Sequence, residues 1–294
     1  MNILKKAYEN AKINKGRVIF PESGNEKILK AIEYLHKENL ADIVFCEDEK
    51  ISSLHENVLI KNRPKIKRKL ASKILQKPIY LAGSMLALNK ADVMIAGIET
   101  PTKNIIESAG LTLGYKEKNN FSSSVFLMIF DDGKEVIFSD CALNVNIDIN
   151  ILVNIAKNAS KIAKSLYGKS MVSMLSYSTL SSGKGPTVDL VSEATKILKN
   201  LNYNVVGPIQ VDAALSKAVS KAKQINNWEE SNVFIFPSLD SGNIAYKLCQ
   251  QLANAKAIGP FLEGFKKPIC DLSRGATTED IINATLLSFL MKNL

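Results

Sequence analysis

Short apolar runs alternate along the chain with segments of helical periodicity, a pattern typical of an α/β fold. Two of these runs, 123–130 and 135–138, flank the sequence Asp-Asp-Gly-Lys at 131–134, and a short turn of this composition favours a β-hairpin. A hairpin makes its two strands antiparallel, so we expect a mixed sheet. The other apolar runs predict strands at 17–20, 42–45, 91–97, 170–176 and 232–236.

Apolar side chains at helical spacing mark the segments between these runs. Asn25 is placed to cap a helix that carries Ile28, Ile32 and Leu35 on one face. The sequence shows no internal repeat and no low-complexity linker, so composition marks no domain boundary. Further helices are predicted at 66–76, 150–166, 188–198, 211–223, 241–252 and 279–291, with a short one that ends at 86–88.

The length of 294 residues suggests one large or two medium domains. Hydrophobic residues at 46% and charged residues at 23% are ordinary for a globular protein and argue against disorder. No uninterrupted apolar run approaches the roughly 18 residues of a membrane helix, and the first residues lack the apolar core of a secretory signal. We therefore expect a cytoplasmic protein that has no membrane partner.

Cysteine and histidine are too sparse to suggest a metal centre. The two histidines, His36 and His55, leave little room for a His-based metal site or a Ser-His-Asp triad, so proton chemistry would rest on carboxylates, lysine or a hydroxyl. No pair of cysteines has the C-x-x-C spacing of zinc or redox sites. We expect reduced, mostly buried thiols at Cys46, Cys141, Cys249 and Cys270.

The 38 Lys and Arg residues exceed the 29 Asp and Glu residues by nine, which gives a net charge of +9. Such a surplus suits nucleic acid or a small polyanion such as a nucleotide, phosphate or coenzyme A. The densest basic run, 61–69, contains no aromatic residue and therefore offers no platform for base stacking. A run of this kind is usually a solvated loop and helix face.

Three segments could carry chemistry, and two of them, 175–186 and 236–243, lie between a predicted strand and a predicted helix. In 175–186, hydroxyl residues, two glycines and a lysine could present backbone N–H groups and a cation to an anion, although the Walker A spacing is absent. The alternative is a flexible βα loop. In 236–243, Asp240 or Ser241 could cap the following helix or, together with Asn243, line a ligand crevice at the strand ends.

The third segment, 271–280, has both a structural and a chemical interpretation. Thr277 and Asp280 have the T-x-x-D spacing of a capping box, so Asp280 could serve only the helix terminus. Alternatively, Ser273, Arg274 and Asp280 converge on one site, where the arginine binds a phosphate and the aspartate takes a proton. The residues alone leave both interpretations open.

Long segments of the chain resemble the phosphate acetyl/butyryltransferase family. They comprise 17–32, 123–128, 138–146, 171–186, 232–248, 255–275 and 278–284. The resemblance implies a two-domain α/β fold with mixed sheets and helices on both faces, similar to isocitrate and isopropylmalate dehydrogenases. It also implies an active cleft between the domains and a homodimer. The expected domains are 1–120 with 265–294, and 121–264.

The resemblance further implies that the protein interconverts acetyl phosphate and coenzyme A with acetyl-CoA and phosphate. Asp280 would be the base on the thiol, and Ser273 and Arg274 would stabilise the transition state. Coenzyme A is then a substrate, no cofactor is permanently held, and no metal is required because phosphate leaves as a stable anion. The expected substrate contacts are Thr100, Ser123, Ser178, Thr179, Ser181, Ser182, Gly183, Lys184, Gly185, Asp240 and Asn243.

Two arginines that the family associates with anionic substrate are absent here. Ala87 occupies one position, and Ile106 or Glu107 the other. Nearby lysines, Lys90 and Lys103, could substitute; otherwise acetyl phosphate binds less well or the acyl group differs. The alternatives to an active phosphate acetyltransferase are therefore a weakened relative that senses acetyl-CoA or an acyl phosphate, and a phosphate butyryltransferase. Nucleic acid is no longer needed to explain the charge.

Overall fold

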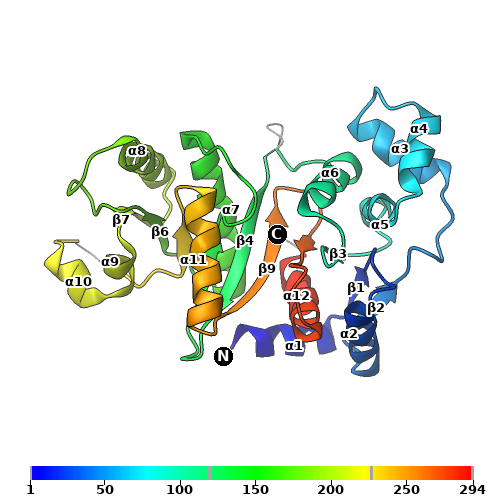
Figure 1. Cartoon of the computed structure of the whole chain (residues 1–294), viewed down its shortest axis with the longest axis horizontal. Helices are drawn as coiled ribbons and strands as arrows, with labels where there is room; N and C mark the ends of the chain where they lie inside the picture. Colours follow the sequence, from blue (N-terminus) through cyan, green and yellow to red (C-terminus); the bar gives the residue numbers. More distant parts are fainter. Residues whose placement is uncertain (1, 118–120, 226–227, 293–294) are drawn as a thin grey trace. The chain divides into compact units, whose positions relative to one another are not determined.

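The computed structural model describes residues 2–117, 121–225 and 228–292. The chain divides into two compact units, which are coloured along the sequence in Figure 1. The first unit combines Met1–Asn120 with Ile258–Asn293, and the second is Phe121–Ala257. The chain returns to the first unit at Ile258, before the expected return at 265. Each unit is a mixed α/β structure built on its own set of strands.

The first unit is built on the strand order β2–β1–β3–β10–β9, in which only β9 runs antiparallel to its neighbour in this set. Its strands are β1 (Gly16–Ile19), β2 (Ala41–Val44), β3 (Val93–Ala96), β9 (Lys256–Glu263) and β10 (Ile269–Asp271). Its helices are α1 (Ile3–Ile13), α2 (Glu26–Lys37), α3 (Ser53–Asn62), α4 (Arg68–Leu75), α5 (Pro78–Ala87), α6 (Thr102–Thr112) and α12 (Thr278–Met291).

The second unit has the strand order β4–β5–β8–β6–β7. Strands β4 and β5 form the predicted antiparallel hairpin, and the other pairs are parallel. The strands are β4 (Ser123–Ile129), β5 (Glu135–Ser139), β6 (Val172–Leu175), β7 (Val205–Ile209) and β8 (Val233–Ile235). The helices are α7 (Ile149–Tyr167), α8 (Pro186–Asn200), α9 (Val211–Leu215), α10 (Lys217–Ala222) and α11 (Leu239–Leu252).

Burial on both faces explains why the central strands read as continuous apolar runs. Every residue of β3, β4 and β6 is buried, so these strands show no alternation of polar and apolar positions. In the second unit, Phe138 meets Phe234 and Phe236 edge to face, and Phe126 stacks on Tyr246 of α11 with ring centroids 4.4 Å apart. These rings form the centre of that unit's core.

Helix ends follow from local hydrogen bonding. The predicted cap of α2 is confirmed, since the Asn25 side chain accepts a hydrogen bond from Lys27 N at 3.0 Å. The prediction of one helix over 211–223 is wrong: α9 and α10 are separated at Ser216, whose backbone is extended. The Ser216 hydroxyl accepts from Val219 N and so caps the second helix, a bond that competes with continuous helix.

We expect Gly16→Ala to destabilise the first unit. An added Cβ would overlap the Phe289 ring of α12, which is only 2% exposed. Overpacking of this kind costs about 1–3 kcal/mol of unfolding free energy. Urea unfolding measures the change, and Gly24→Ala is the control because its Cβ would meet nothing within 4 Å. Equal unfolding free energies for the two variants would contradict the prediction.

Candidate active site

The segment between β10 and α12 exposes Ser273 and Arg274. Immediately before them, Leu272 N donates a hydrogen bond to the carbonyl oxygen of Ala96 at 2.6 Å. A turn follows, in which Ser273 Oγ accepts from Gly275 N at 3.2 Å. The chain thus leaves a buried strand and immediately presents a hydroxyl and a guanidinium to solvent, where both can reach an anionic ligand.

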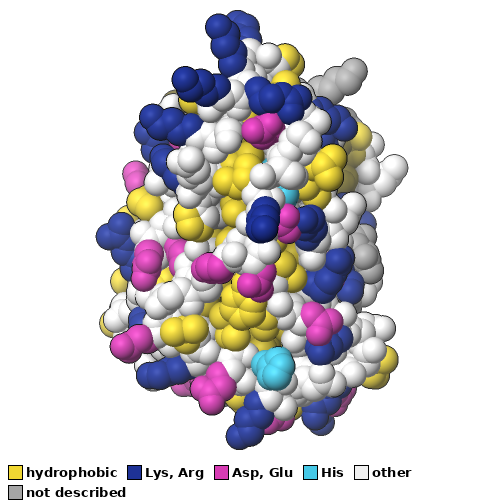
Figure 2. All heavy atoms as spheres, turned by 90° about the vertical axis from the view of Figure 1, so that its right-hand side faces the viewer, with side chains coloured by type: hydrophobic (Ala, Val, Ile, Leu, Met, Phe, Trp, Pro, Cys, Tyr) yellow, Lys and Arg dark blue, Asp and Glu magenta, His cyan; other side chains and the backbone are white. Residues whose placement is uncertain are grey.

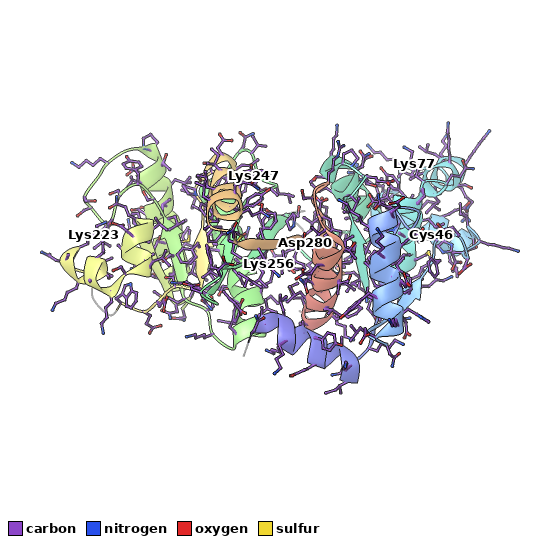
Figure 3. The ribbon with its side chains drawn as sticks, turned by 60° about the horizontal axis from the view of Figure 1, so that its bottom comes forward. Cys46, Lys77, Lys223, Lys247, Lys256 and Asp280 are labelled. Carbon is purple, nitrogen blue, oxygen red and sulfur yellow. The ribbon has the colours of Figure 1, made fainter. Side chains whose placement is uncertain are left out.

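Asp280 lies in the first turn of α12, at the helix end labelled in Figure 3, and forms a capping box with Thr277. Its Oδ2 accepts from Thr277 N at 2.9 Å and from Thr277 Oγ1 at 2.8 Å. The structural interpretation of the T-x-x-D spacing is therefore confirmed. Both bonds use Oδ2, so Oδ1 takes no part in the capping box.

Thr100 lies in the turn between β3 and α6. Its backbone N donates to Glu22 Oε1 at 2.6 Å, and the three preceding amides, 97–99, also donate to the Glu22 carboxylate. Strands β3 and β10 are parallel neighbours, so their carboxyl ends share one edge. The turn of Thr100 and the loop of Ser273 therefore lie side by side in the first unit.

A buried carboxyl group, Asp271, ends β10 directly before this loop. It is 3% exposed, and its Oδ1 has no hydrogen-bond partner in the described part of the chain. Burial raises the pKa of Asp271 to about 6, and the negative charge of Glu22 adds to the rise, whereas a hydrogen bond with Thr102 opposes it. This carboxyl group changes its charge close to neutral pH.

The loop between β6 and α8 in the second unit is hydrogen-bonded to itself. Ser178 and Thr179 are 2% and 5% exposed. The Ser182 hydroxyl lies 3.1 Å from Ser178 Oγ and accepts from Thr179 N at 3.1 Å. Thr179 Oγ1 donates to the side chain of Gln210 and accepts from its backbone N. Three of the predicted ligand-binding hydroxyls therefore hold the loop in shape.

The outer part of the same loop faces solvent. Ser181 and Lys184 are exposed, and the Tyr177 hydroxyl fixes the backbone by donating to Lys184 O at 2.8 Å. Gly183 packs closely on the inner loop, and Gly185, with φ of 148°, is the N-cap of α8. A lysine next to the unpaired N–H groups of a helix terminus suits an anion.

Ser123, at the start of β4, and Asn243, in the helix after β8, each form a hydrogen bond within the second unit. Ser123 is fully buried, and its Oγ accepts from Asn158 Nδ2 at 2.9 Å. Asn243 Nδ2 donates to the carbonyl oxygen of Cys141 at 3.0 Å. Both contacts are structural in this state, and a contact of either residue with substrate stays a prediction.

The cap of α11 is Ser238, not Asp240 or Ser241 as the sequence suggested. The Ser238 hydroxyl accepts from Ser241 N at 3.2 Å, and Ser241 Oγ accepts in return from Ser238 N at 3.3 Å. The cap differs from the prediction because the helix begins at Leu239, earlier than the apolar periodicity indicated. Asp240 is exposed in the first turn, where its carboxylate complements the helix dipole.

Asp140 organises the turn after β5, although it is completely buried. Its carboxylate accepts from the backbone N of Ser124, Ala142, Leu143 and Asn144 at 3.0–3.3 Å. The side chains of Ser124 and Asn144 donate to it as well. A buried carboxylate with this many donors is compensated for its loss of water.

The structure thus gathers the predicted residues into two groups, one in each unit. In the second unit, the loop 178–185 follows β6, and Asp240 and Asn243 follow its parallel neighbour β8. Ser123 begins β4, which is antiparallel to β5, so it lies at the same edge. In the first unit, Thr100 lies beside the loop 273–280. Polar groups at the carboxyl ends of strands are typical of ligand sites in α/β sheets.

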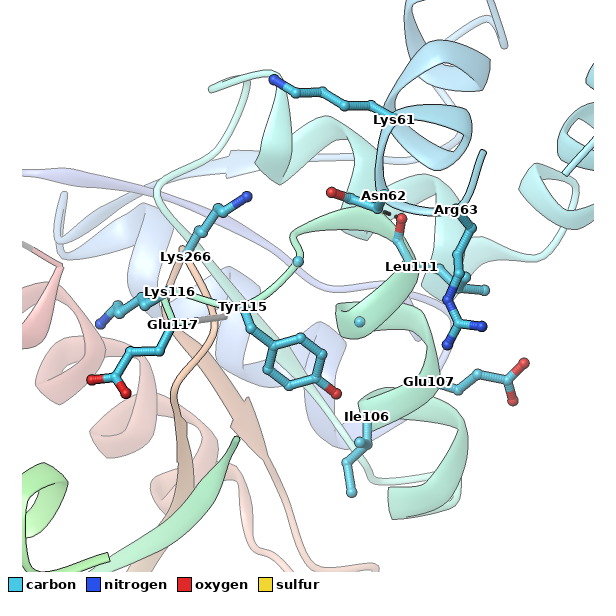
Figure 4. Close-up of a pocket in the computed structure, with 12 residues that line it drawn as sticks. Lys61, Asn62, Arg63, Ile106, Glu107, Leu111, Tyr115, Lys116, Glu117 and Lys266 are labelled. Carbon is cyan, nitrogen blue, oxygen red and sulfur yellow. Dashed lines mark hydrogen bonds between the residues drawn. The ribbon is translucent and has the colours of Figure 1, made fainter. Parts of the chain in front are cut away.

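A hollow of about 590 Å³ in the first unit is lined by Lys61, Arg63, Lys116 and Lys266 (Figure 4). Two of these cations belong to the basic run 61–69, and Lys and Arg side chains gather at the end of the face in Figure 2 where α3 and α4 lie. The run is therefore partly a solvated surface and partly the wall of a hollow.

The positions of the missing arginines lie on α5 and α6. Ala87 ends α5, whereas Ile106 and Glu107 line the hollow. Lys90 forms an ion pair with Glu49 at 2.5 Å, so it is already engaged. Lys103 is exposed in the first turn of α6.

Three buried acids escaped the sequence analysis as functional candidates: Glu22, Asp140 and Asp271. Glu22 and Asp140 each follow a predicted strand within a few residues, whereas the strand that ends at Asp271 was not predicted. An acid placed shortly after a buried strand can meet unpaired backbone N–H groups, and that position is the signal that could have identified Glu22 and Asp140.

The prediction of reduced, mostly buried thiols is confirmed, since all four cysteines are free and three are buried. Across residues 2–117, 121–225 and 228–292, no cluster of three or more His, Cys, Asp or Glu could hold a metal ion. Within the same residues, every helix is too short or too polar to span a membrane.

Comparison with solved structures places this chain in a known class of mixed α/β proteins. A phosphotransacetylase from Streptococcus pyogenes superposes with a TM-score of 0.91 at 29% identity, covering 99% of this chain and 98% of that one. The model of the phosphate acetyl/butaryl transferase family matches residues 45–289. The chain belongs to this family.

Two curated relatives are both phosphate acetyltransferases. The protein of Acetivibrio thermocellus is 34% identical over 98% of this chain and 97% of its own length. The protein of Nitratidesulfovibrio vulgaris is 34% identical over 95% of this chain, but the chain spans only 44% of that longer protein. The similarity thus covers nearly all of the Acetivibrio thermocellus protein and less than half of the Nitratidesulfovibrio vulgaris protein.

We expect Asp271 to make stability fall as pH rises from about 4 to about 6. In this range the folded protein holds a proton that the unfolded chain has released, because the folded pKa lies near 6 and the ordinary value near 3.9. The linked loss of unfolding free energy between pH 4 and pH 7 is about 2 kcal/mol. Urea unfolding at pH 4 and pH 7 measures it, and Asp271→Asn should flatten the difference. Parallel pH profiles would contradict the prediction.

Proposed function

We propose that this protein is a phosphate acetyltransferase that interconverts acetyl phosphate and coenzyme A with acetyl-CoA and phosphate. The similarity over nearly the whole length of the Acetivibrio thermocellus relative supports the activity. The observation that carries the proposal is the loop 273–280, where an exposed serine and arginine precede a carboxylate with one oxygen outside its capping box. These are the groups that acyl transfer between a thiol and phosphate requires.

Asp280 acts as the general base. A free thiol has a pKa near about 8.5 and is mostly protonated at neutral pH. As the sulfur of coenzyme A attacks the acetyl carbon, the carboxylate takes the thiol proton, the new C–S bond forms, and the C–O bond to phosphate breaks. The electron pair of that bond leaves with phosphate. A positioned base typically contributes about 10²–10⁴-fold to the rate.

Ser273 and Arg274 stabilise the charge that develops during this attack. The acetyl oxygen becomes an oxyanion, and a donor aimed at it contributes on the order of 3 kcal/mol. The guanidinium can also hold the phosphate in a bidentate manner. Their exposure directly after β10 leaves both groups open to a ligand.

Substrate contacts of the second unit come from the outer part of the loop 178–185, with Ser181 and Lys184 as the groups that face solvent. Ser178, Thr179 and Ser182 support them by holding the loop. Asp240, Asn243, Ser123 and Thr100 complete the proposed set. Action in the cytoplasm, a homodimer, and the dehydrogenase-like arrangement of domains with a cleft between them stay predictions from the resemblance.

The missing arginines are consistent with weaker binding of anionic substrate rather than lost chemistry. An apolar residue at position 87 removes one charge-assisted contact, worth roughly 1.5–3 kcal/mol. Lys90 does not replace it freely, because Glu49 already holds its ammonium group. The proposed base and its neighbours on the loop 273–280 are retained.

We expect Asp280→Asn to lower kcat by about 10²–10⁴-fold, because an amide cannot take the thiol proton. The amide oxygen of asparagine can still accept from Thr277 N in the capping box, so the melting temperature should change little. The measurement is coenzyme A-dependent loss of acetyl phosphate by purified protein. Glu279→Gln, the neighbouring acid of the same helical turn, is the matched control and should retain the rate.

A purified wild-type protein with the same rate as Asp280→Asn would exclude this role and favour a sensor of acetyl-CoA or acyl phosphate. Acyl preference is settled by the same assay with butyryl phosphate. Faster turnover of butyryl than of acetyl phosphate would identify a phosphate butyryltransferase instead.

A further inference from the structure

The turn after β3 directs four consecutive backbone N–H groups at one side chain. Gly97 N and Ile98 N donate to Glu22 Oε2 at 3.1 and 3.0 Å, and Glu99 N and Thr100 N donate to Oε1 at 3.2 and 2.6 Å. Successive amides that converge in this way form a concave anion site. Here a carboxylate of the same chain fills that site.

Glu22 is well suited to hold this turn. It follows β1 at the carboxyl edge of the first unit, and its side chain is only 8% exposed. Four amide donors compensate the ionised carboxylate for its loss of water. A neutral amide could not do the same, because its NH₂ group would face N–H donors instead of accepting from them.

The turn held by Glu22 is pressed against the segment that leads to Ser273. A Cβ on Gly97 would lie 2.5 Å from Asp271 Oδ1 and closer still to the carbonyl oxygen of Leu272. Leu272 N also donates to Ala96, the last residue of β3. A shift of the turn would therefore be passed directly to the backbone that precedes Ser273.

The carboxyl group of Asp271, next to this turn, indicates that the arrangement lowers the stability of the fold. Asp271 is buried with an unpartnered Oδ1 beside Gly97, and it lies close enough to Glu22 for the two negative charges to repel. Two carboxyl groups at one buried strand edge lower stability unless their donors offset the cost. The same edge carries the proposed catalytic loop.

We propose that Glu22 is a positioning residue for acyl transfer: by holding the turn 97–100 it fixes the segment 271–272 and thereby aims Ser273 and Arg274. This inference rests on the proposed function. Both oxygens of the Glu22 carboxylate accept hydrogen bonds from the turn 97–100. The carboxylate acts on Ser273 and Arg274 through the backbone of the turn 97–100 and of the segment 271–272. Its loss therefore misplaces the groups that stabilise the transition state and leaves their chemistry intact.

The test is Glu22→Gln assayed for acetyl phosphate turnover with varied coenzyme A and acetyl phosphate. We expect kcat to fall about 10²-fold, the size of effect that a small misplacement of catalytic groups produces, with both KM values within about threefold of wild type. Glu22→Asp keeps the charge and should recover part of kcat. Glu99→Gln is the matched control, since its side chain lies in the same turn but is exposed, and it should retain wild-type rates.

The outcomes separate this inference from the function on which it rests. A folded Glu22→Gln with wild-type kcat, or with raised KM and unchanged kcat, overturns the positioning role while the proposed function stands. If Glu22→Gln does not fold, a folded Glu22→Asp with a kcat below that of Glu99→Gln supports the inference, and one with wild-type kcat overturns it. Wild-type protein without turnover overturns both.

Discussion

Backbone N–H groups that follow the carboxyl end of a buried strand must find hydrogen-bond acceptors. In each unit, the oxygens of a buried carboxylate are those acceptors. Glu22 takes this role after β3 in the first unit, and Asp140 takes it after β5 in the second. An orphaned amide would cost as much as a lost hydrogen bond. In the first unit, the turn held by Glu22 lies directly against the segment that leads to Ser273.

The two groups of polar residues differ in how they are held. The loop 178–185 relies on its own hydroxyls, which bond to one another and to Gln210. The loop 273–280 relies on its neighbours: the Ala96 carbonyl before it and the capping box of α12 after it. The first arrangement lowers the entropy that a loop loses when a ligand binds. The second ties the reactive groups to a strand and a helix.

Much of the fold could be predicted because several of its strands, such as β3, β4 and β6, are short and completely buried. Apolar runs such as 91–97 and 123–130 have no alternation to obscure them, and the turn between β4 and β5 has a clear composition. β7 was missed because Gly207-Pro208 reads as a break, although the strand lies at the end of its set, where proline is tolerated. Ser216 divided a predicted helix because its hydroxyl competes with the helical backbone.

The site was predictable only in part, for a physical reason. Ser273, Arg274 and Asp280 are close in sequence, so their spacing already indicated a shared loop. Glu22 and the turn 97–100 are far apart in sequence, and only the pairing of β1 with β3 brings them together. The lone acid after β1 had no local partner that could mark it. The hollow beside Glu107 likewise depends on how α3 and α6 pack.

The path of the chain has a consequence for the order in which the protein can fold during synthesis. Strand β10, which pairs with β3, and helix α12, whose Phe289 lies against Gly16, both come after the second unit in the sequence. The second unit, Phe121–Ala257, is complete before them. Domains fold as units as they leave the ribosome. The first unit therefore waits, with β3 lacking one neighbour, until the segment that follows the second unit has been made.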